Sequence, residues 1–295
     1  NKKILVVVAH PDDELLGLGA SMHKLINEQG SKVRVVILGE GITSRSDNRD
    51  QKIWEKELII HKQNIESARK FIGYESVGIY DFPDNRFDTV ALLDIIKVIE
   101  KEKEDFQPEI IFTHHGGDLN IDHQRTFEAV ITCTRPMEQE FVSSIITFET
   151  PSGTEWRAST DPKHFIPNLF IEISEDNLNS KIKAMESYSF EKRTYPHPRS
   201  PESLRILAQY RGMSVGKFFA EDFIKVVPKG THDLKKFISP NQLIKEAENY
   251  KIILDDITGF TPTFSIKNIL NKEFGEFKLS SNIEVNYGLA GINLK

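Results

Sequence analysis

The stretch KILVVVAHPDDE, residues 3–14, decides how the chain folds. After Lys3 it is an unbroken apolar run as far as residue 9, which is typical of a parallel strand buried on both faces. Pro11 keeps His10 extended at the strand end, and proline itself suits the first turn of a helix. The sequence therefore predicts a strand at 3–9 that leads through a polar motif into a helix over about 14–29.

A second stretch repeats this design about a hundred residues later. The apolar run IIFT, residues 110–113, leads directly into HHGGDLNIDH, residues 114–123. Ligands of open α/β sheets bind at the carboxyl ends of the strands, so we expect the two loops to share one site. Two histidines and one aspartate are a plausible ligand set for catalytic zinc, which keeps an open position for water.

Asp12, Asp13 and Glu14 are expected in the first turn of the helix, where the helix dipole favours negative charge. Neighbouring helical residues point in different directions, so one aspartate can bind a metal while the other handles a proton. The alternative for this motif alone is a capped helix start that binds nothing.

Strand and helix patterns alternate over the first 150 residues, which predicts a parallel sheet with right-handed crossovers. Strands are predicted at 3–9, 33–38, 77–81, 109–113 and 144–149, and helices at 14–29, 50–72, 89–105 and 123–134. A loop beside the site at 151–167, a strand at 168–173 and helices at 175–187 and 201–212 follow.

The polar motifs resemble those of the LmbE-like, or PIG-L, family of zinc-dependent N-acetyl-sugar deacetylases. The resemblance rests on AHPDDE at 9–14, FPDN at 82–85, DLNIDH at 118–123, PHPRSP at 196–201 and AEDF at 220–223. It covers roughly residues 1–228 and implies a Rossmann-like α/β fold, a mostly parallel sheet flanked by helices, with no nucleotide role.

The resemblance also implies roles for individual residues. His10, Asp13 and His123 match the metal ligands, Asp12 matches the general base that activates the water, and Asp84 matches a position that contacts the sugar in relatives. The implied reaction is hydrolysis of an N-acetyl group on an amino sugar or glycoconjugate, giving acetate and a free amine. One Zn²⁺ per chain is the implied cofactor, with other divalent metals as alternatives.

Asn120 departs from the family pattern, because many relatives carry a histidine there that stabilises the oxyanion. An asparagine amide can donate a hydrogen bond to an oxyanion, but it cannot act as a cationic acid. His114, His115 or His197 can supply that function, and His197 is the first choice because it lies in the PHPRSP motif.

Three further residues are candidates for contact with the substrate. Arg199 lies in the PHPRSP motif, and Arg45 follows the second strand at the same sheet edge as the site, although loop arginines are more often simply solvated. Trp156 is expected either to stack on a sugar ring or to pack against the domain.

Composition excludes several classes of protein. The 295 residues carry a net charge of −6, which argues against general nucleic-acid binding. No apolar stretch approaches the ~20 residues of a membrane span, and no signal peptide is evident. The single cysteine, Cys133, excludes an internal disulfide and suits a reducing compartment, so we expect a cytoplasmic protein, with a homo-oligomer left open.

The sequence changes character after residue 228. GTHDLKKFI at 230–238, DITG at 256–259 and VNY at 285–287 resemble the C-terminal segment of ubiquinone-biosynthesis O-methyltransferases. The glycine-rich loop that would bind S-adenosylmethionine has no counterpart, so we expect no methyl transfer. Residues 229–295 are predicted to form a small α+β module with a helix ending near 249, strands at 251–257 and 283–289 paired as a hairpin, and a helix near 266–272.

The sequence therefore predicts a metal-dependent N-deacetylase, residues 1–228, with a small module appended. Two alternatives remain: a non-catalytic scaffold that binds a glycan or a partner protein, and a bifunctional protein whose tail is related to a methyltransferase.

Overall fold

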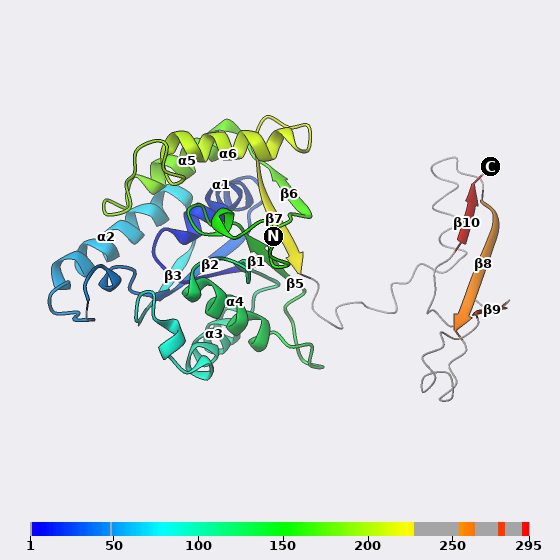
Figure 1. Cartoon of the computed structure of the whole chain (residues 1–295), viewed down its shortest axis with the longest axis horizontal. Helices are drawn as coiled ribbons and strands as arrows, with labels where there is room; N and C mark the ends of the chain where they lie inside the picture. The colour runs from blue at the N-terminus through cyan, green and yellow to red at the C-terminus, as the bar shows by residue number, and fades with distance from the viewer. Residues whose placement is uncertain (1, 48, 227–253, 263–276, 281–290, 295) are drawn as a thin grey trace. The chain divides into compact units, whose positions relative to one another are not determined.

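The computed structural model describes residues 2–47, 49–226, 254–262, 277–280 and 291–294 (Figure 1). The chain divides into two compact units, Asn1–Thr231 and His232–Lys295. What the second unit does stays a prediction.

The first unit is built on a seven-stranded sheet with the order β3-β2-β1-β4-β5-β7-β6. The strands are β1 (Lys3–Val8), β2 (Lys32–Gly39), β3 (Ser76–Phe82), β4 (Ile110–His114), β5 (Ser144–Phe148), β6 (Leu169–Glu172) and β7 (Ala220–Val226). The first five are mutually parallel, and β7 runs antiparallel to both of its neighbours. The predicted mostly parallel α/β sheet is confirmed.

Helices cover both faces of this sheet, with α1, α2, α5 and α6 on one side and α3 and α4 on the other (Figure 1). The helices are α1 (Asp13–Asn27), α2 (Glu55–Ile72), α3 (Leu92–Phe106), α4 (Ile121–Cys133), α5 (Glu175–Met185) and α6 (Pro201–Met213). Short 3₁₀ turns lie at η1 (Thr43–Arg45), η2 (Phe87–Thr89) and η3 (Thr154–Trp156).

The apolar run of β1 explains why it occupies the middle of the sheet. Side chains of a strand alternate between its faces. Ile4, Val6 and Val8 enter the core beneath α1, α2 and α5, while Leu5 and Val7 enter the core beneath α3 and α4. β1 thus has no solvent face, and its carboxyl end lies between β2 and β4.

Helix α1 approaches the sheet closely and is kinked. A Cβ on Gly17 would lie 2.2 Å from Cδ2 of Phe148, so only glycine fits there. At Leu18 the backbone leaves helical geometry, with φ −149° and ψ 20°.

A buried ion pair satisfies the backbone groups at this kink. The Glu221 carboxylate accepts the N–H groups of Ala20 and Ser21, at 3.3 and 2.6 Å. Lys181 donates to the carbonyl of Leu16 at 2.8 Å and to Glu221 at 2.6 Å. The pair therefore replaces helical hydrogen bonds that the kink breaks.

The structure differs from the sequence-based expectations in three places. Helix α2 begins at Glu55 rather than near residue 50. Strand β7 was not expected, because charged residues interrupt its apolar pattern. Asp12 is not in the first helical turn: it is the N-cap of α1 in a left-handed conformation, with φ 95°, and its N–H donates to Glu14 Oε2 at 3.0 Å.

In the second unit, the described residues form strands β8 (Leu254–Pro262), β9 (Phe277–Ser280) and β10 (Gly291–Leu294). β8 pairs antiparallel with both β9 and β10. β8 overlaps the predicted strand at 251–257, whereas the predicted strand at 283–289 and both predicted helices lie outside the described residues. Among the described residues of the whole chain, no helix is long and apolar enough to cross a membrane.

Candidate metal and active site

The carboxyl ends of β1 and β4 bring the two polar motifs together. β1 pairs directly with β4, and His10 follows the end of β1 while His123 lies in the first turns of α4. Asp13 stands between them: its Oδ2 is 3.3 Å from His10 Nδ1 and 3.3 Å from His123 Nε2. The three side chains offer ligand atoms that all lie within 4.8 Å of one another.

In both His10 and His123, the ring nitrogen that does not face Asp13 contacts another carboxylate. Asp122 Oδ2 lies 2.8 Å from His10 Nε2, and Asp118 Oδ1 lies 3.1 Å from His123 Nδ1. Metal-binding histidines in proteins are usually oriented in this way, because the second carboxylate fixes the tautomer and the ring plane. Both rings therefore present their remaining nitrogen to Asp13.

The charges at this site are strongly coupled. Burial alone would raise the pKa of Asp13, but the rings of His123 and His114 and a hydrogen bond with His10 hold it well below its usual range. Burial alone would lower the pKa of His123, but Asp13 and Asp118 raise it to about 9. His10 likewise has its pKa raised against burial, by Asp122 and Asp13. The carboxylates thus create a strongly negative potential where the three side chains converge.

The donor set fits a divalent metal ion. Two imidazole nitrogens and one carboxylate oxygen are the ligands of many catalytic zinc sites. The buried Nε2 of His123 lies 3.3 Å from Asp13 Oδ2 but makes no hydrogen bond of normal geometry within the part of the chain that the structure describes, and a buried polar atom of this kind normally makes one. A ligand bond to a metal would satisfy it.

A second group of close donor atoms comes from His10, Asp84 and Asp122. Its carboxylates already have partners: Asp122 accepts the N–H groups of Asn85 and Phe87, and Asp84 accepts the Ser44 N–H and hydroxyl. These acids are better explained as supports of the site than as a separate ion site.

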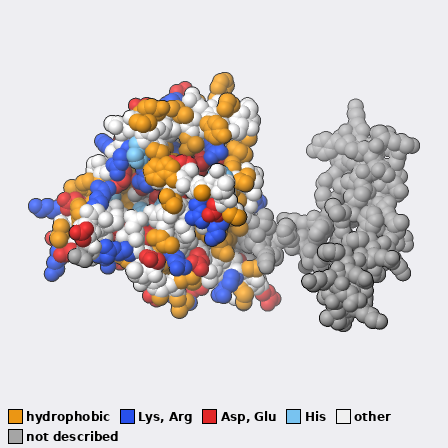
Figure 2. Space-filling view, viewed as in Figure 1, with side chains coloured by type: hydrophobic (Ala, Val, Ile, Leu, Met, Phe, Trp, Pro, Cys, Tyr) orange, Lys and Arg blue, Asp and Glu red, His pale blue; other side chains and the backbone are white. Residues whose placement is uncertain are grey.

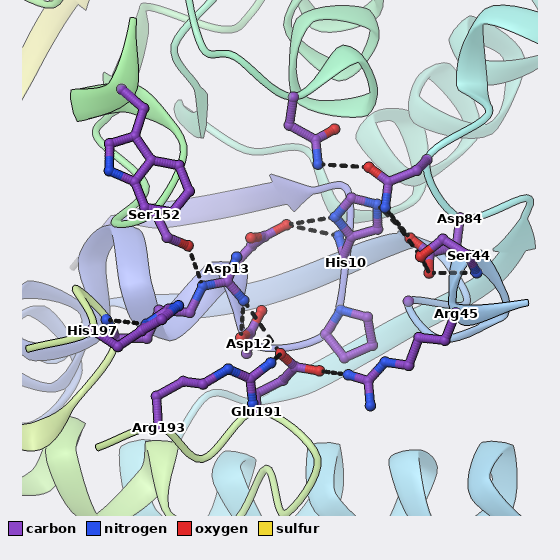
Figure 3. Close-up of a pocket in the computed structure, with 16 residues that line it drawn as sticks. His10, Asp12, Asp13, Ser44, Arg45, Asp84, Ser152, Glu191, Arg193 and His197 are labelled. Atoms are coloured by element: carbon purple, nitrogen blue, oxygen red, sulfur yellow. Dashed lines mark hydrogen bonds and ion pairs between the residues drawn. The ribbon is translucent and has the colours of Figure 1, made fainter. Parts of the chain in front are cut away.

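Asp12 faces the cavity from the strained turn before α1. A non-glycine residue at positive φ is uncommon and is often found at functional sites. Burial raises the pKa of Asp12 well above its usual range, although Arg199 opposes this effect. Arg199 Nη1 donates to Asp12 Oδ2 at 2.9 Å, so the carboxylate has a fixed direction (Figure 3).

Arg199 belongs to a chain of ion pairs that joins three loops. Its Nε donates to the Ser152 hydroxyl at 2.7 Å, and its Nη1 lies 3.5 Å from Glu191 Oε2. Glu191 also pairs with Arg45, from the loop after β2, and with Arg193 at 3.2 Å (Figure 3). Arg45 therefore lies at the site as expected, but it contacts a glutamate of the chain.

These groups surround a cavity of about 250 Å³ with an almost entirely polar lining. The candidate residues that line it are His10, Asp12, Asp13, Arg45, Asp84, Asn120, His197 and Arg199. Trp156 also lines it and remains 55% exposed, at the rim. His123 does not line this cavity: it lies buried behind Asp13.

The three histidines that could replace the family histidine absent at position 120 lie in different environments. His114 is fully buried, accepts the Ala9 N–H at 2.9 Å and stacks on His123 with ring centroids 3.8 Å apart. His115 Nε2 lies 2.7 Å from the Lys163 carbonyl and lines a different cavity. Of the three, only His197 lines the site.

Asn120 itself is the N-cap of α4. Its Oδ1 accepts the Asp122 N–H at 2.8 Å, and its Nδ2 donates to Asn85 Oδ1 at 3.0 Å. Its amide N–H₂ is therefore oriented by a neighbour at the cavity wall.

Sequence reasoning did not find Glu191, Asp118 or Asp122. Asp118 and Asp122 lie within the DLNIDH motif, close to His123. Because a histidine ligand usually has a carboxylate as its hydrogen-bond partner, the motif could have indicated their role. Glu191 lies in the connection between α5 and α6, and no local pattern distinguishes it from a surface glutamate.

The comparison with known families agrees with the site. The model of the PIG-L family, described as GlcNAc-PI de-N-acetylase, matches residues 5–134. YaiS of Escherichia coli K12, an uncharacterized deacetylase, is 28% identical over 193 residues, which are 63% of this chain and 90% of YaiS.

A shorter match concerns a different enzyme. Over 70 residues the chain is 39% identical to the ubiquinone biosynthesis O-methyltransferase of Aeromonas salmonicida A449. The match covers 23% of this chain and 25% of the enzyme, so the chain spans about a quarter of that relative.

Solved structures share the fold. The N,N′-diacetylchitobiose deacetylase of Pyrococcus horikoshii aligns with a TM-score of 0.61 at 19% identity, over 77% of this chain and 84% of that one. The zinc-inhibited form of teicoplanin deacetylase Orf2 aligns with a TM-score of 0.60 at 15% identity, over 77% of this chain and 99% of that one. GalB, the 4-carboxy-2-hydroxymuconate hydratase of Pseudomonas putida KT2440, aligns with a TM-score of 0.59 at 21% identity, over 79% of this chain and 99% of that one.

At these identities the structural likeness shows the fold alone, and the hydratase demonstrates that this fold serves more than one reaction. The sequence comparisons show that residues 5–134, which contain His10, Asp13 and His123, are similar to the PIG-L, or LmbE-like, family, and that the chain is similar to the deacetylase YaiS over 193 residues.

Proposed function

We propose that the chain is a metal-dependent hydrolase that removes the acetyl group from an N-acetylated amino sugar or glycoconjugate. The observation that carries the proposal is the convergence of His10, Asp13 and His123, with His123 buried behind the two that line the cavity, and the separate carboxylate of Asp12 in the same cavity. A metal-ligand set with a spare carboxylate is the arrangement that amide hydrolysis by activated water requires.

His10, Asp13 and His123 would hold the ion, and zinc is the metal that suits their donor atoms best. When bound, zinc acts as a Lewis acid and lowers the pKa of a coordinated water to about 7. Other divalent metals that accept nitrogen and oxygen ligands remain alternatives.

Asp12 is the general base in this proposal. Its carboxylate accepts a proton from the attacking water, and Arg199 keeps it aimed into the cavity. Once it has accepted this proton, Asp12 can pass it on to the leaving amine.

Asn120 and His197 are the groups that meet the reacting carbonyl and the departing nitrogen. The Asn120 amide donates a hydrogen bond as negative charge develops on the carbonyl oxygen. Burial and the nearby Arg193 and Arg199 lower the pKa of His197. The lowered pKa favours the neutral imidazole near pH 7, so His197 must first gain a proton before it can serve as a second donor to the amine.

The polar lining supports a sugar as the substrate. Asp84, Asn85 and Ser44 form one hydrogen-bonded wall of the cavity, and such groups can bind sugar hydroxyls. Trp156 at the rim offers an aromatic face on which a pyranose ring can pack.

Acetate release from a panel of N-acetylated sugars tests the proposal. The zinc-loaded chain should release one acetate per free amine formed. Asp12→Ala should lose about a hundredfold or more in kcat, as expected for loss of a general base, and still bind zinc. His115→Ala, at a histidine outside the cavity, is the matched control and should retain activity. Full activity in Asp12→Ala would remove the assigned base.

A further inference from the structure

The backbone at Asp12 keeps its carboxylate available to the cavity. Asp12 is the N-cap of α1, and an aspartate at that position usually accepts hydrogen bonds from the first N–H groups of the helix. Within the described part of the chain, the Asp12 side chain caps none of these groups. It meets Arg199 at the cavity instead, because φ at Asp12 is 95° and not in the extended region typical of an N-cap.

This left-handed backbone needs support from its surroundings. A non-glycine residue at positive φ costs free energy and persists only where the surrounding structure holds it. The Asp12 N–H donates to Glu14 Oε2 at 3.0 Å, and the Asp12 carbonyl accepts the N–H groups of Leu15 and Leu16, both at 2.9 Å. Both main-chain polar groups of Asp12 are therefore fixed.

Glu14 is itself held by a tyrosine from a distant segment. The Tyr188 hydroxyl donates to Glu14 Oε1 at 2.6 Å. Both side chains are fully buried, so water does not compete for this hydrogen bond. Figure 2 shows hydrophobic side chains on the surface over α5 and α6, but Tyr188, in the connection between these helices, lies in the core.

These contacts close a ring of hydrogen bonds and ion pairs through the site. The Tyr188 carbonyl accepts the Glu191 N–H at 2.9 Å. Glu191 Oε2 lies 3.5 Å from Arg199 Nη1, and the same Nη1 donates to Asp12 Oδ2 at 2.9 Å. The ring therefore holds Asp12 at two points: its N–H through Glu14 and its carboxylate through Arg199.

Glu14 and Tyr188 influence the reaction only indirectly. Neither side chain lines the polar cavity, and neither belongs to the candidate ligand set. Any effect on proton transfer must therefore pass through Asp12. A displacement of about 1 Å in a catalytic group can cost on the order of a hundredfold in rate.

The alternative is that the two residues serve packing alone. A buried tyrosine hydroxyl needs a partner in any protein core, and a buried glutamate is costly unless it is hydrogen-bonded. An apolar side chain in place of Glu14 would fill the same space without that cost. The bond that such a side chain could not make is the one to the Asp12 N–H, and this bond therefore explains the glutamate better than packing does.

We propose that Glu14 and Tyr188 are positioning residues that hold the Asp12 carboxylate in the direction required for proton transfer. The inference rests on the proposed function and adds two buried residues to its machinery. They act through the main chain of Asp12, without contact to the substrate.

Acetate release from the methyl glycosides of N-acetylglucosamine and of N-acetylgalactosamine tests the inference. Tyr188→Phe removes the hydroxyl and keeps the ring in the core. With zinc loaded, this variant should lower kcat on the preferred glycoside by about tenfold or more and change KM by less than about twofold, because the groups that bind substrate are untouched. Its zinc content should equal that of the unmodified chain.

Two variants at position 14 separate hydrogen bonding from charge. Glu14→Met keeps the length of the side chain and removes both acceptor oxygens, so it should lower kcat at least as far as Tyr188→Phe. Glu14→Gln keeps an oxygen that accepts the Asp12 N–H and gains an N–H₂ that can donate to the Tyr188 oxygen, so it should keep kcat within about threefold of the unmodified chain.

Tyr74→Phe is the matched control for the loss of a buried hydroxyl. Tyr74 is fully buried in the same core cluster as Tyr188, but its hydroxyl donates to the Ile65 carbonyl at 3.4 Å. This variant should keep the kcat of the unmodified chain. An equal fall in kcat in Tyr74→Phe and Tyr188→Phe, or no fall in Tyr188→Phe, overturns the inference.

The remaining outcomes separate the two proposals. Equal losses of kcat in Glu14→Gln and Glu14→Met assign the effect to the charge of Glu14 and overturn the positioning role; this pair also decides if Tyr188→Phe does not fold. If the unmodified chain releases no acetate, the proposed function fails, and hydrogen exchange of the Asp12 amide, followed by NMR, decides the inference. Exchange about tenfold faster in Tyr188→Phe than in Tyr74→Phe and the unmodified chain supports the positioning role, and equal rates overturn it.

Discussion

Replacing Lys181 by methionine should destabilise the first unit strongly, because it removes one partner of a buried ion pair. The side chains of Lys181 and Glu221 are 6% and 7% exposed, and their charged atoms are 2.6 Å apart. Methionine keeps most of the lysine stem, which packs against Gly19, so the change mainly removes the ammonium group.

The expected loss of stability comes from the buried groups that Lys181→Met leaves without a partner. Among the described residues, Glu221 would keep only the N–H groups of Ala20 and Ser21 as partners, and the Leu16 carbonyl would lose the Lys181 ammonium as its donor. Breaking a buried pair from one side costs about 3–5 kcal/mol. For a unit of this size, each kcal/mol lowers the melting temperature by about 2–4 °C, so a decrease of about 6–20 °C is expected.

Urea and thermal unfolding, followed by circular dichroism, measure this change. Lys183→Met is the matched control, since Lys183 is exposed on the same helix, and it should change the free energy of unfolding by less than about 0.5 kcal/mol. The double variant Lys181→Met with Glu221→Gln should recover part of the loss, because no uncompensated charge remains. A Lys181→Met variant within 1 kcal/mol of the unmodified chain would refute the role given to this pair.

Two further predictions concern the dependence of stability on pH. Burial lowers the pKa of His61 to about 4, whereas the value in the unfolded chain is about 6.5. The unfolded chain therefore binds a proton that the native state does not, and the free energy of unfolding falls by up to about 3 kcal/mol as pH falls from 6.5 to 4. His61→Leu should remove that acid-dependent loss in urea titrations at several pH values, and an unchanged slope would contradict the assignment. Burial and Glu149 raise the pKa of Asp222 to about 9, although the neighbouring Arg211 opposes this effect. The native state therefore holds a proton that the unfolded chain releases near pH 4, and the free energy of unfolding falls as pH rises between these values. Asp222→Asn should therefore gain stability relative to the unmodified chain between pH 5 and pH 9, and a constant difference over this range would show that Asp222 does not retain the proton.

The sequence was most informative where local pattern and burial agree. The apolar runs of β1 and β4 predicted central parallel strands, and their polar continuations predicted which residues meet at the sheet edge. His10 and His123 are more than a hundred positions apart, yet the pairing of β1 with β4 brings both to Asp13.

Buried acidic and basic side chains account for most of what the sequence did not reveal. Strand β7 contains Glu221 and Asp222, which read as surface residues, but they are buried because Lys181 and Arg211 reach them from distant helices. Glu191 was not predicted for the same reason, because its partner Arg45 is distant in the sequence. The left-handed turn at Asp12 depends on a hydrogen bond to Glu14, whose carboxylate is itself fixed by Tyr188. Such contacts are specified by the fold rather than by neighbouring residues.

Zinc content per chain, measured by mass spectrometry after loading and removal of free metal, tests whether His10, Asp13 and His123 hold a metal ion. We expect about one zinc ion per chain, lost in His10→Ala and in His123→Ala and retained in Asp12→Asn. Full zinc content in either histidine variant, or no bound zinc in the unmodified chain, would contradict this expectation.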